Sequence, residues 1–78
     1  MSKPYFASVN ANGYLVYSDA NSPKDHFNAV EYQGMSEDLQ EKMRETWSGV
    51  ENINVTALTF SNVFEASDYC VKHGFIVL

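Results

Sequence analysis

The stretch that decides the fold class covers residues 5–18, which run Tyr5-Phe6-Ala7-Ser8-Val9-Asn10-Ala11-Asn12-Gly13-Tyr14-Leu15-Val16-Tyr17-Ser18. Two β-rich runs flank an Asn-Gly pair, whose residues both tolerate the positive φ that a two-residue hairpin turn requires. The pattern therefore predicts a β-hairpin with strands over 5–10 and 14–18. A two-residue turn would pair Ala11 with Tyr14, Val9 with Val16 and Ala7 with Ser18.

This pairing sorts the hairpin side chains onto two faces, because successive residues of a strand point to opposite sides. One face would carry Ala7, Val9, Tyr14 and Val16. The other would carry Phe6, Ser8, Leu15 and Tyr17. Both sets are partly apolar, so we expect helices to cover one face and exposed aromatic side chains to occupy the other.

Residues 19–25 form a polar loop, and the segment after it fits two patterns. Ser22-Pro23 followed by Asp25 is typical of a helix start, with a capping serine, a proline in the first turn and an acid three residues on. Residues 26–33, however, alternate in side-chain type as a strand does, and Gly34 ends the run. We favour a third antiparallel strand over 26–33 and keep the helix as the alternative.

Residues 36–48 show the clearest helical pattern. Ser36 is a good N-cap, and acidic residues follow it in the first turn, where the helix dipole favours anions. Asp38 and Lys42 stand at i,i+4 and predict an ion pair. Gly49 ends the helix, and the apolar residues recur at helical spacing: Leu39, Met43, Trp47 and Val50.

The second half of the chain predicts a strand, a helix and a final strand. Residues 52–60 are β-rich, and Asn62 with Glu65 resembles a capping box that starts a helix over 62–73. Gly74 ends this helix, and 75–78 form a short apolar strand. The order resembles a split βαβ element, whose crossover is right-handed if the strands are parallel neighbours.

These elements predict an α+β fold: a small, mainly antiparallel sheet of four or five strands with two helices packed on one face. One compact domain over 1–78 fits the length. The expected core comprises Val9, Val16, Leu39, Met43, Trp47, Val55, Ala57, Phe64, Ala66, Cys70 and Ile76.

Composition excludes several classes of function. Five Lys and Arg oppose ten Asp and Glu in 78 residues, which gives a net charge of −5. Direct binding to nucleic acid or to an anionic membrane requires basic patches, whereas the basic residues are scattered: Lys3, Lys24, Lys42, Arg44 and Lys72. No apolar run has the length of a signal peptide or a membrane span, and one cysteine cannot form an internal disulfide. We therefore expect a cytoplasmic protein whose partner is another protein.

Two groups of residues carry side chains that could support chemistry. Cys70 and His73 stand at i,i+3, which permits a thiol–base pair or half of a metal site, with His26 or Asp68 as further ligands. A packed cysteine and a histidine stabilised by the helix C-terminus explain them better. Residues in and after the polar loop offer acid–base groups without fixed geometry: Asp19, Asp25, His26 and Glu31. We expect no catalytic residue, metal or cofactor.

A row of carboxylates is the most informative functional feature. Glu37, Glu41 and Glu45 recur at i,i+4 with Asp38 beside them, and like charges at this spacing cost stability. They are either a solvated helix face or an acidic ridge that meets a basic surface. Tyr14 and Tyr17 belong to a tyrosine-rich sheet, and tyrosine is favoured at protein interfaces.

The function that the sequence favours is therefore a small, acidic, non-enzymatic protein-binding module. Its sharper form is an inhibitor that covers a basic nucleic-acid-binding surface through the ridge, with Tyr14 or Tyr17 as an anchor. In size, charge and layout the chain resembles phage-encoded accessory inhibitors. The alternatives are a homo-oligomeric structural subunit that buries its aromatic sheet face against its own copy, and an enzyme or metal site centred on Cys70 and His73.

Overall fold

The chain folds around one four-stranded sheet with helices on both sides. The computed structural model describes residues 4–47 and 49–78, so Lys3 and position 48, the last of the predicted helix 36–48, lie outside the described residues. The elements in order are β1 (Phe6–Val9), β2 (Tyr14–Ser18), α1 (Pro23–Gln33), α2 (Glu37–Met43), the short 3-10 helix η1 (Val50–Asn52), β3 (Val55–Thr59), α3 (Val63–His73) and β4 (Ile76–Val77).

The sheet is mixed, with the strand order β3-β2-β1-β4. β1 and β2 pair antiparallel, as do β2 and β3, whereas β1 and β4 pair in parallel. The α+β class is confirmed. The predicted arrangement of two helices beside a mainly antiparallel sheet is wrong, because a third helix is present and β4 makes the sheet mixed.

The hairpin forms, but its register differs by one residue from the prediction. Val9 lies opposite Leu15 and Ala7 opposite Tyr17. Asn10 is the cause: its side-chain oxygen accepts hydrogen bonds from the amides of Asn12 (2.9 Å) and Tyr14 (3.1 Å). The loop therefore holds three residues and needs a positive φ only at Gly13, at 82°.

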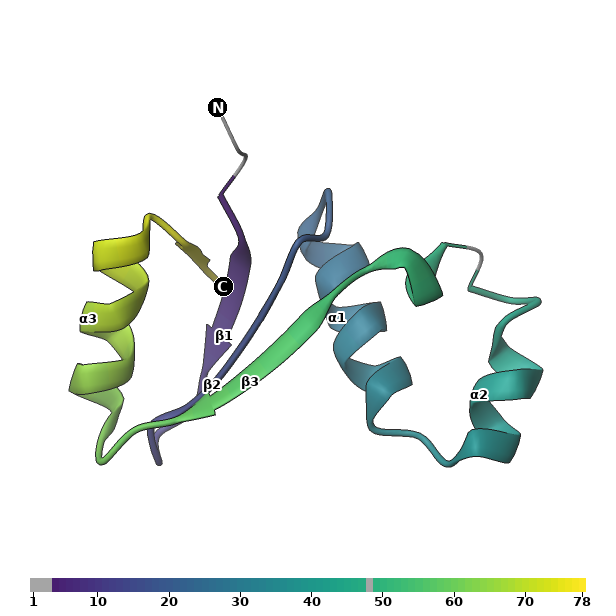
Figure 1. Cartoon of the computed structure of the whole chain (residues 1–78), viewed down its shortest axis with the longest axis horizontal. Helices are drawn as coiled ribbons and strands as arrows, with labels where there is room; N and C mark the ends of the chain where they lie inside the picture. The colour runs from purple at the N-terminus through teal and green to yellow at the C-terminus, as the bar shows by residue number, and fades with distance from the viewer. Residues whose placement is uncertain (1–3, 48) are drawn as a thin grey trace.

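The new register sends the hairpin's side chains to different partners. Ala7 and Leu15 now share a face and are fully buried in a cluster with Ala66 and Cys70 of α3. The side chains on the other face of the hairpin, such as Ser8 and Ser18, point toward α1. This helix lies across the sheet from α3 (Figure 1). The prediction of helices on one face is therefore wrong, since each sheet face has its own helix.

Residues 26–33 belong to α1, so the favoured strand is wrong and the alternative holds. The Ser22 side chain accepts a hydrogen bond from the Asp25 amide at 3.2 Å, and Pro23 occupies the first turn. His26, Ala29 and Tyr32 recur every three residues and are the buried residues of the helix. Local capping and this buried stripe outweigh the weak alternation that suggested a strand.

α2 is shorter than the predicted helix over 36–48. Ser36 caps it as expected, accepting from the Leu39 amide at 3.4 Å. After Met43 the chain continues in turns, and Met43 and Trp47 both pack against the buried cluster of Ala29, Tyr32 and Val50.

The expected core is partly right. Val16, Ala66 and Cys70 are buried, and Val9, Met43, Trp47 and Val55 are half-buried. Phe64 is 80% exposed because Ala66 and Cys70 occupy the inner side of α3. Leu15 is fully buried through the shifted register. The remaining expected core residues are exposed in the structure: Leu39, Ala57 and Ile76.

α3 and the strands around it lie close to their predicted bounds. The Asn62 side chain accepts from the Glu65 amide at 3.0 Å, and Gly74 ends the helix with φ 70°. β3 and β4, which this helix connects, lie at opposite edges of the sheet with β2 and β1 between them. They are therefore not the parallel neighbours that the simplest βαβ unit would give.

Candidate functional site

Negative charge is concentrated in one segment of the chain, residues 31–51. Six carboxylates face two cations there, so this segment carries −4 of the total net charge of −5. α2 lies within the segment, and in Figure 1 it stands at the end of the molecule farthest from α3. The carboxylates are those of Glu31, Glu37, Asp38, Glu41, Glu45 and Glu51.

The α2 acidic surface, defined as Glu37, Asp38, Glu41 and Glu45, is exposed at all four positions. Glu37, Asp38 and Glu41 lie on the helix, and Glu45 follows in the next turn. Three of the four, with Lys42, line a shallow depression. In the described part of the chain, the expected ion pair between Asp38 and Lys42 does not form. These carboxylates are therefore left to solvent or to a partner.

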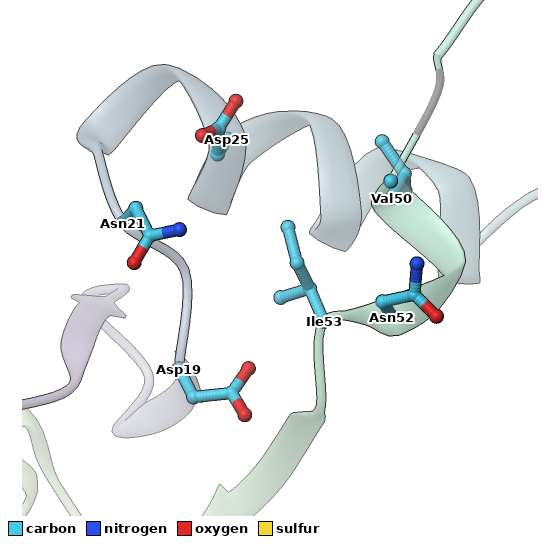
Figure 2. A pocket seen from close by; sticks show the side chains of 7 residues that line it. Asp19, Asn21, Asp25, Val50, Asn52 and Ile53 are labelled. Carbon is cyan, nitrogen blue, oxygen red and sulfur yellow. The ribbon is translucent and has the colours of Figure 1, made fainter.

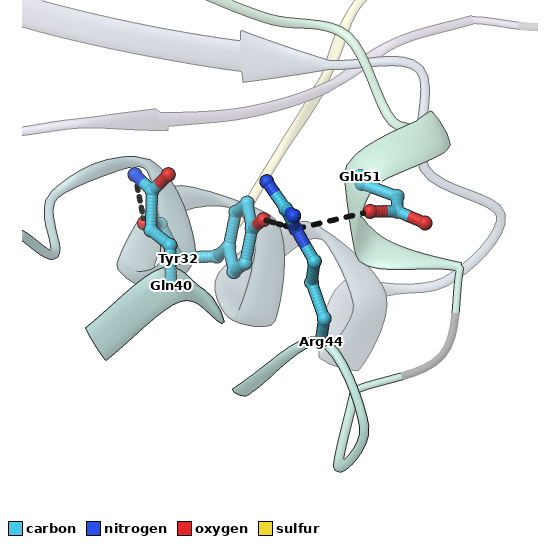
Figure 3. Close-up of polar contacts among 4 residues, drawn as sticks. All are labelled: Tyr32, Gln40, Arg44 and Glu51. Carbon is cyan, nitrogen blue, oxygen red and sulfur yellow. Dashed lines mark hydrogen bonds and ion pairs between the residues drawn. The ribbon is translucent and has the colours of Figure 1, made fainter. Parts of the chain in front are cut away.

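The inner side of α2 is fixed to α1 by polar contacts around Tyr32 (Figure 3). The Gln40 side chain donates to the Tyr32 carbonyl at 3.1 Å and to the Met35 carbonyl at 3.2 Å. Arg44 Nε donates to the Tyr32 hydroxyl at 3.3 Å and lies 3.4 Å from a Glu51 carboxylate oxygen. These contacts hold the helix while its acidic side stays outward.

Arg44 is consequently engaged within the molecule. Its hydrogen bond to Tyr32 and the nearby carboxylates raise the pKa of the Arg44 guanidinium above its ordinary value. A permanently charged Arg44 that pairs with Glu51 offsets that one carboxylate and leaves the α2 acidic surface unbalanced.

The two candidate tyrosines lie on opposite faces of the sheet. Tyr14 is 45% exposed on the α1 side and lines an apolar depression with Val16, Val30 and Ala57. Tyr17 is half-buried on the α3 side, where its ring lies 4.7 Å from Phe75 between centroids. Of these two tyrosines, Tyr14 therefore lies on the same side of the sheet as α1, the helix to which α2 is fixed.

A buried histidine network was missed at the level of sequence. His26 is fully buried, with Nδ1 at 2.6 Å from the Ser18 hydroxyl and Nε2 at 3.3 Å from the Ser8 hydroxyl. Desolvation by burial lowers the pKa of His26, which favours the neutral ring. A hydroxyl at Nδ1, where a catalytic triad has a carboxylate, cannot balance an imidazolium charge. The network therefore joins α1 to the hairpin.

Cys70 and His73 do not act on a common site. Cys70 is fully buried against the sheet, and desolvation raises the pKa of its thiol. His73 is exposed, donates from Nδ1 to the Tyr69 carbonyl at 2.9 Å and stacks on the Tyr69 ring. Across residues 4–47 and 49–78, no three His, Cys, Asp or Glu side chains are grouped so that they could hold a metal ion.

The polar loop contributes to a cavity at the start of α1, lined mainly by polar side chains (Figure 2). Asp19 lines it but is engaged, since its carboxylate accepts from the Asn54 backbone amide at 2.8 Å and from the Asn54 side chain at 2.9 Å. Asp25 also lines the cavity. His26 is turned into the core and Glu31 is exposed, so the four acid–base candidates do not converge.

Among the helices that the structure describes, none has both the length and the apolar character needed to cross a lipid bilayer. No protein-family model, curated protein or solved structure matches the chain.

Proposed function

We propose that this chain is a small, non-enzymatic protein-binding module that covers a basic, nucleic-acid-binding surface of a partner protein, as phage-encoded accessory inhibitors do. The observation that carries the proposal is the α2 acidic surface: four exposed carboxylates without an ion pair among the described residues, in a segment that holds −4 of the net charge. A basic partner relieves the mutual repulsion that these carboxylates impose on the free protein.

The spacing of the carboxylates supports mimicry of a phosphate backbone. Glu37, Asp38 and Glu41 lie within about 6 Å of helix rise. One strand of duplex DNA carries a phosphate about every 3.4 Å along the axis. The linear charge density is thus comparable, and a surface built to hold phosphates would also attract this helix.

An exposed apolar side chain lies beside the α2 acidic surface. Leu39 follows Asp38 on α2 and is 38% exposed, about 100° around the helix from that carboxylate and so at the border of the α2 acidic surface. Buried apolar anchors contribute more to affinity than rim charges do, whereas charges mainly accelerate and orient the encounter. Leu39 therefore serves as the anchor of the proposed contact, with Tyr14 as a second candidate on the same side of the sheet.

The proposal assigns the module to the cytoplasm and to a protein partner, without cofactor or catalytic role. A lone, buried thiol suits a reducing compartment. The alternative in which the aromatic sheet face stacks on its own copy gains no support, because α3 packs over the face that carries Tyr17.

The test compares two variants of equal net charge. One removes three charges from the α2 acidic surface through the substitutions Glu37→Gln, Glu41→Gln and Glu45→Gln. The other adds three charges at exposed positions away from α2, as Asn12→Lys, Phe64→Lys and Val71→Lys. Each changes the net charge of −5 by three units to −2.

Each variant is immobilised and used to capture partners from a cytosolic extract of the source organism, or of its host for a phage protein. The glutamine variant should retain at least about tenfold less of the basic partner, while the lysine variant retains it. Circular dichroism checks that both are folded. Equal retention by the wild type and the glutamine variant would refute the proposal.

A further inference from the structure

The strand β3 is an unprotected sheet edge. It lies at the end of the strand order, and residues 52–64 around it contain no charged side chain. Natural proteins shield such edges with lysine, proline, bulges or very short strands. β3 has five residues, pairs with β2 without a bulge and contains neither proline nor charge. The opposite edge, β4, has only two residues.

The shape of the molecule leaves this edge open. Its extents are 37 × 30 × 14 Å, and three gaps between four strands span about 14 Å. Figure 1 looks along this shortest dimension, and β3 crosses the front of the view with the helices to either side of the sheet. The helices thus cover the faces of the sheet and not the β3 edge.

The register identifies the backbone groups that point outward. Phe60 donates to the Gly13 carbonyl at 3.0 Å, and Asp19 donates to the Asn54 carbonyl at 3.3 Å. Hydrogen-bonded positions alternate along an antiparallel pair, so Thr56 and Leu58 also bond to β2. The amides and carbonyls of the intervening residues point away from the sheet: Val55, Ala57 and Thr59.

We infer that β3 pairs antiparallel with β3 of a second copy, about a twofold axis at Ala57, to form a continuous eight-stranded sheet. In this register Ala57 lies opposite Ala57 of the second copy, and Val55 lies opposite Thr59. Each outward residue gains both of its backbone hydrogen bonds. Thr56 then lies opposite Leu58 of the second copy, which covers that half-buried side chain on the α3 side.

The sequence of β3 favours its own copy as the occupant. A strand centred on a small residue, with β-branched or apolar residues on both sides, is self-complementary under twofold symmetry. No like charges meet at the axis, although the free chains carry −5 each. The repulsion acts at a distance and is screened by salt, so salt strengthens the dimer. Binding through the α2 acidic surface weakens with salt, which separates the two proposals experimentally.

Amide hydrogen exchange of the wild-type chain tests the inference without a mutation. At protein concentrations of roughly 5 and 500 µM, the amides of Val55, Ala57 and Thr59 should exchange several-fold more slowly at the higher value. Thr56 and Leu58 are internal controls, since their amides bond to β2 in the monomer as well. Exchange at the outward amides that does not depend on concentration would overturn the inference.

Sedimentation equilibrium supplies the second readout. The wild type should approach twice its mass of 8.8 kDa. Ala57→Lys, which places two cations at the axis, should weaken the dimer at least about tenfold, whereas Asn12→Lys, with the same charge change in the hairpin loop, should not. Ala57→Pro should also weaken it, because it removes only an outward amide. A wild type that remains monomeric at the higher concentration, or edge amides protected only by an added extract protein, would overturn the inference.

Discussion

The hydrogen bond between Ser18 and His26 predicts a large and local stability effect. Ser18 and His26 are both fully buried, and their side chains meet at 2.6 Å. Ser18→Ala leaves His26 Nδ1 without a partner in a site that excludes water, which should cost about 1–3 kcal/mol. A domain of this length has a total stability of about 4–12 kcal/mol, so the loss is a sizeable share of it.

Ser8→Ala is the matched control, because it deletes the same hydroxyl opposite the other nitrogen of the same ring. That contact is longer, at 3.3 Å, and Ser8 is half-buried, so water can replace the hydroxyl. Its cost should be only about 0.5–1 kcal/mol. Urea unfolding followed by circular dichroism measures both, at one protein concentration so that self-association does not contribute. An unchanged free energy of unfolding in Ser18→Ala, or a larger loss in Ser8→Ala than in Ser18→Ala, would refute this assignment of the network.

Two further predictions concern pH and backbone strain. Burial lowers the pKa of His26 below its ordinary 6.5, so the unfolded chain takes up the proton first, and the free energy of unfolding should fall as pH drops below about 6.5. In urea melts between pH 7 and 5, His26→Phe should lack this part of the slope; an identical slope would contradict it. Gly13→Ala should cost more than Gly49→Ala in thermal melts: both have positive φ, but only a Cβ at Gly13 would meet backbone, 2.8 Å from Asn62. Equal losses of thermal stability in the two variants would contradict this prediction, because the backbone would then have moved away from the Cβ at position 13.

The hairpin shows how far sequence patterns lead. Its existence follows from the Asn12-Gly13 pair, which is a strong turn signal. Its register does not, because the Asn10 side chain competes for the turn amides and lengthens the loop by one residue. A shift of one residue moves every side chain to the other face relative to its partner strand. Leu15 is therefore fully buried although the predicted core omits it.

The segment over 26–33 shows a different limit. Its helix start was visible in Ser22 and Pro23, yet the alternation of side-chain types favoured a strand. Burial of His26 against two serines of the sheet is a tertiary contact that no local pattern contains. Besides that helix start, the spacing of His26, Ala29 and Tyr32 indicates the buried side of the helix.

The candidate surface was more predictable than the core. Solvent exposure of Glu37, Asp38, Glu41 and Glu45 follows from their charge, and the structure agrees. The relation of Tyr14 and Tyr17 to this surface depends on the three-dimensional placement of α2 beside α1, which the sequence does not determine. The role of Arg44 was also hidden, because its partners lie 12 and 7 residues away on other elements.

In the proposed function, the α2 acidic surface occupies a basic surface that otherwise holds nucleic acid. Displacement by duplex DNA tests it most directly, with the captured partner held on immobilised wild-type protein. DNA should release the partner from the wild type and from the lysine control, while the glutamine variant captures little to release. A partner that stays bound at saturating DNA, in a ternary complex, would contradict the claim.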